Sequence, residues 1–258
     1  MNTPAVSGRR GGNVLHSAGC QAATARGTRG QEATLAHIDH LKTLCGLRGM
    51  AVADVGAGDG LYSRDLAQAG ARVTAIEVDP GKVRKAKDNL PPNIDVRLGR
   101  AEELPLSAKS QGLVCFFFAL HHVPVDAQDA ALSEVRRVLA PGGRLHVVEP
   151  YPHGTMFDVV RMVEDETFVR TNAHRVLSGL DGDGAFQLVD KRDYVLTREY
   201  PTFTAFVDKI VKPDPDRSAV FTRVSQAMEE TYDTVIEDND GARVLHQPCA
   251  AFHFIEKG

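Results

Sequence analysis

Short apolar runs alternate with amphipathic stretches along residues 50–150. The apolar runs predict five strands, at 50–55, 72–77, 94–98, 112–118 and 144–149. Apolar residues at helical spacing predict helices between them, at 61–69, 80–90 and 127–139. Such alternation indicates βαβ units, and therefore a parallel sheet covered by helices on both faces. The fourth run is the most apolar, which places it in the middle of the sheet.

The flanking segments are less regular. A helix is predicted over 32–47, where Leu35, Ile38 and Leu41 recur at helical spacing. Residues 155–180 are expected to be helical, with a break near Glu164 and Asp165. The last part predicts strands at 186–196 and 248–255, and helices at 203–211 and 218–235.

Residues 1–30 differ from the rest in composition. They contain six glycines, four arginines and no acidic residue, which gives about +4 and leaves about −8 on the remainder. This composition predicts a flexible basic tail ahead of one domain at 31–258. An organelle-targeting peptide is the alternative, although the glycines oppose the amphipathic helix that it would need.

Composition limits the function. The chain has 258 residues and a net charge of −4, which disfavours a nucleic-acid partner. Its apolar runs are too short to span a bilayer, and the N-terminus lacks the apolar stretch of a signal peptide. The four cysteines form no CxxC pair, so neither a disulfide framework nor a zinc knuckle is indicated. We expect a cytoplasmic protein, monomeric or homodimeric.

The most informative segment is VADVGAGDG at 52–60. A strand delivers Asp54, glycines follow at 56, 58 and 60, and a helix begins. Such a turn lies where α/β sheets bind nucleotides, at the carboxyl ends of the strands. A nicotinamide dinucleotide would need a third small residue at position 61, which is Leu61. Glu77 ends the next strand, where an acid can accept bonds from both ribose hydroxyls.

With these residues in view, the chain resembles the class I S-adenosylmethionine-dependent methyltransferases, in particular the type 11 small-molecule branch related to ubiquinone and menaquinone methyltransferases. The resemblance covers about residues 48–150. Its segments are VADVGAGDG (52–60), VTAIEVDP (73–80), GRAEELP (99–105), FFFALHHV (116–123) and EVRRVLAPGGRLHVVEP (134–150). It implies an α/β, Rossmann-like, mainly parallel seven-stranded sheet with helices on both faces. A helical insertion at 155–180, after the fifth strand, would form a lid.

The resemblance also implies a cofactor, S-adenosyl-L-methionine, and residues that bind it. Asp54, Gly56 and Gly58 would lie near its methionine part, Glu77 would hold the ribose hydroxyls, and Val78 is a further cofactor-binding candidate. Ala101 and Glu102 would border the adenine, and Phe117 and Phe118 would flank the sulfonium, because aromatic faces attract a cation. Arg100 departs from the family, where an acid often stands, so Glu102 or backbone groups would have to accept from the adenine.

The reaction expected is transfer of the methyl group to a nucleophilic atom of a small-molecule acceptor, for which the protein mainly aligns the two partners. A base is needed only if the acceptor loses a proton, and His121, Tyr151 and His153 are the candidates. No metal is expected, because no histidine and acid cluster shows ligand spacing. Two alternatives remain: a non-catalytic S-adenosylmethionine or S-adenosylhomocysteine sensor or partner subunit, and a nicotinamide-dependent oxidoreductase.

Overall fold

The computed structural model describes Met1 and residues 31–258, and of residues 31–36 and 183 it describes the backbone alone. The expected basic tail therefore lies outside the described residues. No described helix combines the length and the apolar character that crossing a membrane requires.

One sheet forms the centre of the molecule, and seven strands follow one another across it in the order β3, β2, β1, β4, β5, β8, β6. Neighbours from β3 to β5 pair in parallel, and β8 runs antiparallel between β5 and β6. The expected sheet is confirmed, with β4 in its middle. The strands are β1 Ala51–Val55, β2 Arg72–Glu77, β3 Asp95–Leu98, β4 Gln111–Phe117, β5 Leu139–Pro150, β6 Phe186–Glu199 and β8 Ala242–Glu256.

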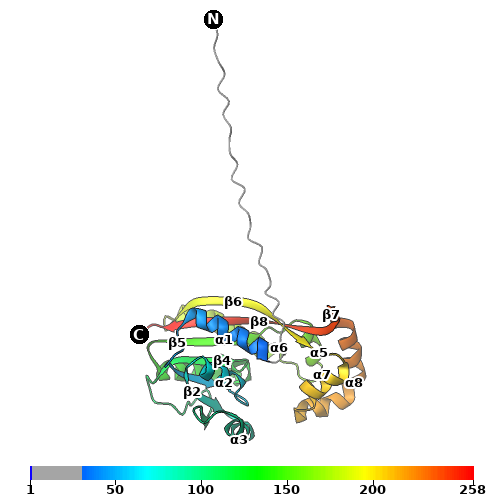
Figure 1. Cartoon of the computed structure of the whole chain (residues 1–258), viewed down its shortest axis with the longest axis horizontal. Helices are drawn as coiled ribbons and strands as arrows, with labels where there is room; N and C mark the ends of the chain where they lie inside the picture. The colour runs from blue at the N-terminus through cyan, green and yellow to red at the C-terminus, as the bar shows by residue number, and fades with distance from the viewer. Residues whose placement is uncertain (2–30) are drawn as a thin grey trace.

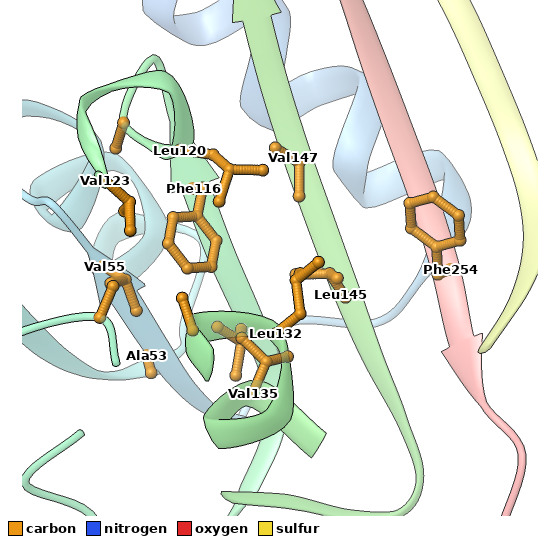
Figure 2. Packing of buried hydrophobic residues seen from close by; sticks show 14 of the residues in the cluster. Ala53, Val55, Phe116, Leu120, Val123, Leu132, Val135, Leu145, Val147 and Phe254 are labelled. Carbon is orange, nitrogen blue, oxygen red and sulfur yellow. The ribbon is translucent and has the colours of Figure 1, made fainter. Parts of the chain in front are cut away.

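Helices cover both faces of the sheet, as predicted. On one face Ile38, Leu66 and Val83 pack from α1 (Gln31–Leu44), α2 (Leu61–Gln68) and α3 (Pro80–Asn89). On the other face α4 (Gln128–Val138) and α6 (Thr167–Gly179) contribute apolar side chains to a second cluster. Figure 2 shows this cluster, in which Phe116 and Val147 of the central strands lie against Leu132 and Val135 of α4.

A third apolar cluster lies at one end of the elongated molecule (Figure 1). There α5 (Thr155–Val160), α7 (Phe203–Phe206), a π-helical turn (Val207–Val211) and α8 (Pro215–Val235) pack around Leu245 of β8. The predicted insertion at 155–180 therefore divides at its expected break. Its first helix, α5, packs on α8 and β8, whereas α6 packs on β5 and on the turn after β4.

The structure differs from the predicted elements chiefly in three strands. Strand β8 begins at Ala242 rather than at residue 248. Strand β5 begins at Leu139 rather than at residue 144, because Leu139 pairs with Gln111 before a register shift at the glycine-rich turn. A short strand, β7 (Glu237–Asn239), pairs with β8 and was not predicted. Its three residues are polar and exposed, so no apolar period marks it.

Candidate cofactor and acceptor site

The carboxyl ends of β1, β2, β4 and β5 meet at one edge of the sheet, and the predicted site residues gather there. The turn after β1 begins at Gly56, whose amide donates to Ile76 O at 2.8 Å. Gly56 has a φ of +73°, and a Cβ there would lie 2.5 Å from the Cβ of Ala119 in the turn after β4. At Gly58, with φ +59°, a Cβ would meet no atom within 4 Å. Gly56 is thus required by packing within the protein, whereas Gly58 faces open space.

Glu77 is buried, although it ends a strand at the sheet edge. Its Oε2 accepts from the amide of Gly58 at 2.8 Å, and its Oε1 accepts from the amide of Asp79 at 2.9 Å. Both backbone bonds fix the plane of the carboxylate across the glycine turn. Each oxygen keeps a further lone pair, so Glu77 can still accept two donors from a ligand.

Asp54 is a second buried acid, one residue before the end of β1. Burial, and to a smaller extent the negative charge of Glu77, raise the pKa of this carboxyl to about 6, against a hydrogen bond from Ser63 that lowers it. The Oγ of Ser63 donates to Oδ2 of Asp54 at 2.5 Å. A carboxylate kept in so unfavourable a place is suited to a positively charged ligand group.

The predicted adenine side is more open. Val78 follows Glu77 and is 57% exposed, and Ala101 is buried. Glu102 forms an ion pair with Arg100, whose Nε donates to Oε1 at 2.6 Å and whose Nη2 lies 2.5 Å from the same oxygen. The unexpected arginine is thus a partner of the nearby acid.

Aromatic rings gather where β4 ends. Phe117 is buried and stacks on Tyr62 with 4.3 Å between ring centroids. Phe118 has a φ of +56° and meets the edge of the His37 ring at 5.4 Å. The Nδ1 of His37 lies 2.6 Å from the hydroxyl of Tyr194. Sequence reasoning identified the two phenylalanines but missed His37, Tyr62 and Tyr194, which come from three other elements.

His37 is uncharged at neutral pH. Burial, and to a smaller extent the neighbouring Arg198 and His40, lower its pKa to about 3. Burial likewise raises the pKa of the Tyr62 and Tyr194 hydroxyls above its usual range. The ring cluster therefore carries no charge of its own.

His121 is buried in the 3-10 turn Leu120–His122 after β4. Its Nδ1 lies 2.5 Å from Oε2 of Glu149, and Oε1 of Glu149 accepts from the amide of Leu120 at 2.8 Å. The Nε2 of His121 faces Oε1 of Glu166, at 3.7 Å. No pattern in the sequence indicated Glu166, which lies between α5 and α6. Glu149 lies one residue before the end of β5, beside β4, and could have been identified.

Tyr151 and His153 lie together after β5. Their rings stack at 5.3 Å, and His174 of α6 stacks on the other side of Tyr151 at 4.2 Å. The Tyr151 hydroxyl donates to Asp193 at 2.6 Å. Burial and this bond raise the pKa of Tyr151 to about 12, so the hydroxyl keeps its proton. His153 is exposed.

Comparison with known proteins identifies the central part of the chain. Residues 53–147 match the family described as a methyltransferase domain. Demethylmenaquinone methyltransferase from Renibacterium salmoninarum is 37% identical over 122 residues, which are 47% of this chain and 49% of that protein. The biotin biosynthesis bifunctional protein BioHC from Cellvibrio japonicus is 32% identical over 121 residues, 46% of this chain and 23% of the relative. The chain thus spans at most about half the length of these curated relatives.

Solved structures share the fold over a longer stretch. A methyltransferase structure described as putative, from Bacillus halodurans, superposes with a TM-score of 0.59 at 20% identity, covering 88% of this chain and 100% of that chain. The [4+2]-cyclase SpnF superposes with a TM-score of 0.58 at 19% identity, covering 88% of this chain and 80% of that one. At these identities the likeness concerns the fold alone. Residues 53–147 therefore match a methyltransferase domain, and the sheet described above has the same fold as these solved structures.

Proposed function

We propose that the protein transfers a methyl group from S-adenosyl-L-methionine to a nucleophilic atom of a small-molecule acceptor. The observation that carries this proposal is the buried Glu77 carboxylate, held by the amides of Gly58 and Asp79 beside a glycine that faces open space. An acid held in this way has oxygen lone pairs left for a pair of adjacent hydroxyls, which a ribose provides.

The other predicted residues fit the remaining parts of the same cofactor. The negative charge of Asp54 would face the ammonium of the methionine part, which would offset the burial of this acid. Phe118 and the uncharged rings of His37 and Tyr62 would lie beside the sulfonium, because ring faces attract a cation and a neutral imidazole does not repel it. Val78, Ala101 and Glu102 would border the adenine.

When bound, S-adenosylmethionine supplies a methyl group that its sulfonium already activates. The work left to this chain is alignment of the acceptor and exclusion of water. Helix α6 lies over the turn after β4, so we propose that it forms the part of the 155–180 lid nearest the acceptor. The chain would retain the product nucleoside through the same Glu77 contacts.

The three predicted catalytic residues would have different roles. Tyr151 retains its proton because its pKa is raised to about 12, so it would contact the acceptor as a stacking surface rather than as a base. His153, exposed and stacked on Tyr151, is free to take a proton from an acceptor. His121 is held by Glu149 and covered by Glu166, which suits a positioning residue.

Calorimetry with S-adenosylhomocysteine tests the cofactor site. Glu77→Ala should weaken binding by about 1–3 kcal/mol, since two charge-assisted hydrogen bonds are lost. Glu229→Ala, a change of an exposed acid on α8, is the matched control and should leave affinity unchanged. Equal affinity in the wild type and Glu77→Ala would remove Glu77 from the site.

Turnover is tested separately with labelled S-adenosylmethionine and a panel of phenols, quinols, amines and thiols. Methyl transfer to any of these supports an enzyme. Tight binding of S-adenosylhomocysteine with no transfer to a broad panel would favour the binding subunit instead.

A further inference from the structure

We propose that His121, His122 and Glu166 form a binding site for a divalent transition-metal ion, a site that the sequence-based expectation of no metal missed. The ligand atoms of the three side chains lie within 4.8 Å of one another. The two histidines follow β4 and Glu166 precedes α6, so the set is assembled from segments more than 40 residues apart and no spacing in the sequence reveals it.

The hydrogen bonds around His121 leave one nitrogen available. Glu149 accepts at Nδ1, so the proton of a neutral ring resides there and Nε2 carries a lone pair. A carboxylate behind the distal nitrogen of a ligating histidine is a recurrent arrangement in metal sites, since it fixes the tautomer and the ring. Glu149 is itself anchored by the amide of Leu120.

Glu166 is also held so that one oxygen remains available. Both Nε and Nη2 of Arg170 donate to Oε2 of Glu166, at 3.0 and 2.6 Å. Its other oxygen, Oε1, lies 3.7 Å from Nε2 of His121 and 3.8 Å from Nδ1 of His122. Two acceptor atoms thus face each other in a buried place, an arrangement that a cation between them would stabilise.

The separations agree with coordination better than with direct hydrogen bonds. At 3.7 Å, Nε2 and Oε1 are too far apart for a hydrogen bond. Two metal–ligand bonds of about 2.0–2.2 Å place their outer atoms roughly 3.4 Å apart at a tetrahedral angle, and at most about 4.2 Å apart. The 3.7 and 3.8 Å separations from Oε1 of Glu166 fall within this range, and the two histidine nitrogens, which lie within 4.8 Å of each other, would adjust around an ion.

The chemistry of the donors selects the ion. Two imidazole nitrogens and one carboxylate oxygen suit Zn²⁺ and Co²⁺, whereas Mg²⁺ prefers oxygen ligands alone. The His122 side chain is 58% exposed, so the ion would keep positions open to solvent or to a further ligand. With neutral histidines, Glu149, Glu166 and Arg170 leave a net negative charge around the site.

If the proposed function holds, an open position would take an oxygen of the acceptor at the same sheet edge as the cofactor, whereas binding of the ion does not depend on that function. His121 would then be a metal ligand rather than a base. Binding measured without S-adenosylmethionine separates the two proposals. Glu77→Ala should lose affinity for S-adenosylhomocysteine and keep its metal site.

The test uses the untagged full chain after treatment with a chelator. Binding of Co²⁺ is measured by its visible absorption, and binding of Zn²⁺ is measured by calorimetry. A single equivalent should bind, and millimolar Mg²⁺ should not displace it. His122→Ala and Glu166→Gln should each weaken binding at least tenfold. Glu229→Gln, which alters an exposed acid on α8, should not.

His122 is exposed, so His122→Ala is expected to fold. Its metal affinity therefore tests the proposal even if Glu166→Gln fails to fold. Absence of Co²⁺ and Zn²⁺ binding would overturn the proposal. Equal affinity in the wild type and His122→Ala would also overturn it.

Discussion

At the residue scale, the burial of Asp54 should make ligand binding depend on pH. The pKa of its carboxyl is raised to about 6, chiefly by burial, so a large fraction is protonated at pH 5 and most is ionised at pH 7. A ligand ammonium binds only the ionised form. The affinity for S-adenosylhomocysteine should therefore rise by about tenfold from pH 5 to pH 7.

Asp54→Asn is the matched variant, because an amide oxygen can still accept from Ser63 but does not titrate. Its affinity should be lower at pH 7 and should change little between pH 5 and pH 7. Calorimetry at both pH values measures this, and an equally steep pH dependence in wild type and variant would show that Asp54 does not face the ligand charge.

The predictable part of the site is the part contained in continuous segments. Asp54, Gly58 and Glu77 lie at strand ends, and parallel strands bring their carboxyl ends to one edge. The rest depends on tertiary packing. His37 and Glu166 lie in segments whose local patterns only predict helices, and only the fold brings them to the edge.

At the element scale, α1 is held on the sheet partly by histidines. His37 contacts Tyr194 of β6, and Nε2 of His40 lies 3.0 Å from Oδ2 of Asp190 on the same strand. The pKa of His37 is lowered to about 3, first by burial. In the unfolded chain His37 takes up a proton at its ordinary pKa of about 6.5, whereas in the folded chain it stays neutral down to about pH 3. The neutral His37 therefore contributes its full share to the free energy of unfolding above about pH 6.5, and this contribution is lost as the pH falls toward 3.

The lowered pKa of His37 predicts that the free energy of unfolding falls in acid, and that one substitution at this position makes the fall smaller. Between pH 7 and pH 5 the His37 contribution should fall by about 2 kcal/mol, at roughly 1.4 kcal/mol per pH unit below 6.5. His37→Gln does not titrate and can still bond to Tyr194. Urea unfolding at the two pH values should show a smaller loss in the variant. An identical loss in both proteins would contradict the assignment.

The secondary structure predicted from the sequence was least complete where the residues of a strand or helix are not buried in a regular pattern. Strands β1, β2, β4 and the second half of β5 were predicted because most of their residues are buried and form apolar runs, whereas in β3 only Val96 is buried. Strand β7 has no buried residue. In the insertion, Phe157 and Val160 are buried, but Phe168 is 71% exposed, so the apolar residues there do not share one face.

At the scale of the whole molecule, two packing units meet along β8 (Figure 1). The helical end has its own core, in which Met228 of α8 is fully buried and the hydroxyl of Tyr232 donates to Tyr200 O at 2.6 Å. Met228→Ala should destabilise the protein by about 2–5 kcal/mol through the cavity it leaves. Gln226→Ala, an exposed change on the same helix, should have little effect.

Hydrogen exchange measures which part of the molecule Met228→Ala destabilises. In Met228→Ala, amides of α7 and α8 should exchange faster than those of β1 to β5, because only the helical end loses packing. Uniformly faster exchange across the sheet would mean that the two units open together.

The central claim is that the sheet edge formed by the glycine turn, Glu77 and the ring cluster holds an adenosine-bearing sulfur compound. A crystal structure of the full chain with S-adenosylhomocysteine tests it most directly. We predict both ribose hydroxyls on the Glu77 carboxylate, and the sulfur beside Phe118 and His37. The nucleoside bound at another surface, with Glu77 contacted only by Gly58 and Asp79, would contradict the account.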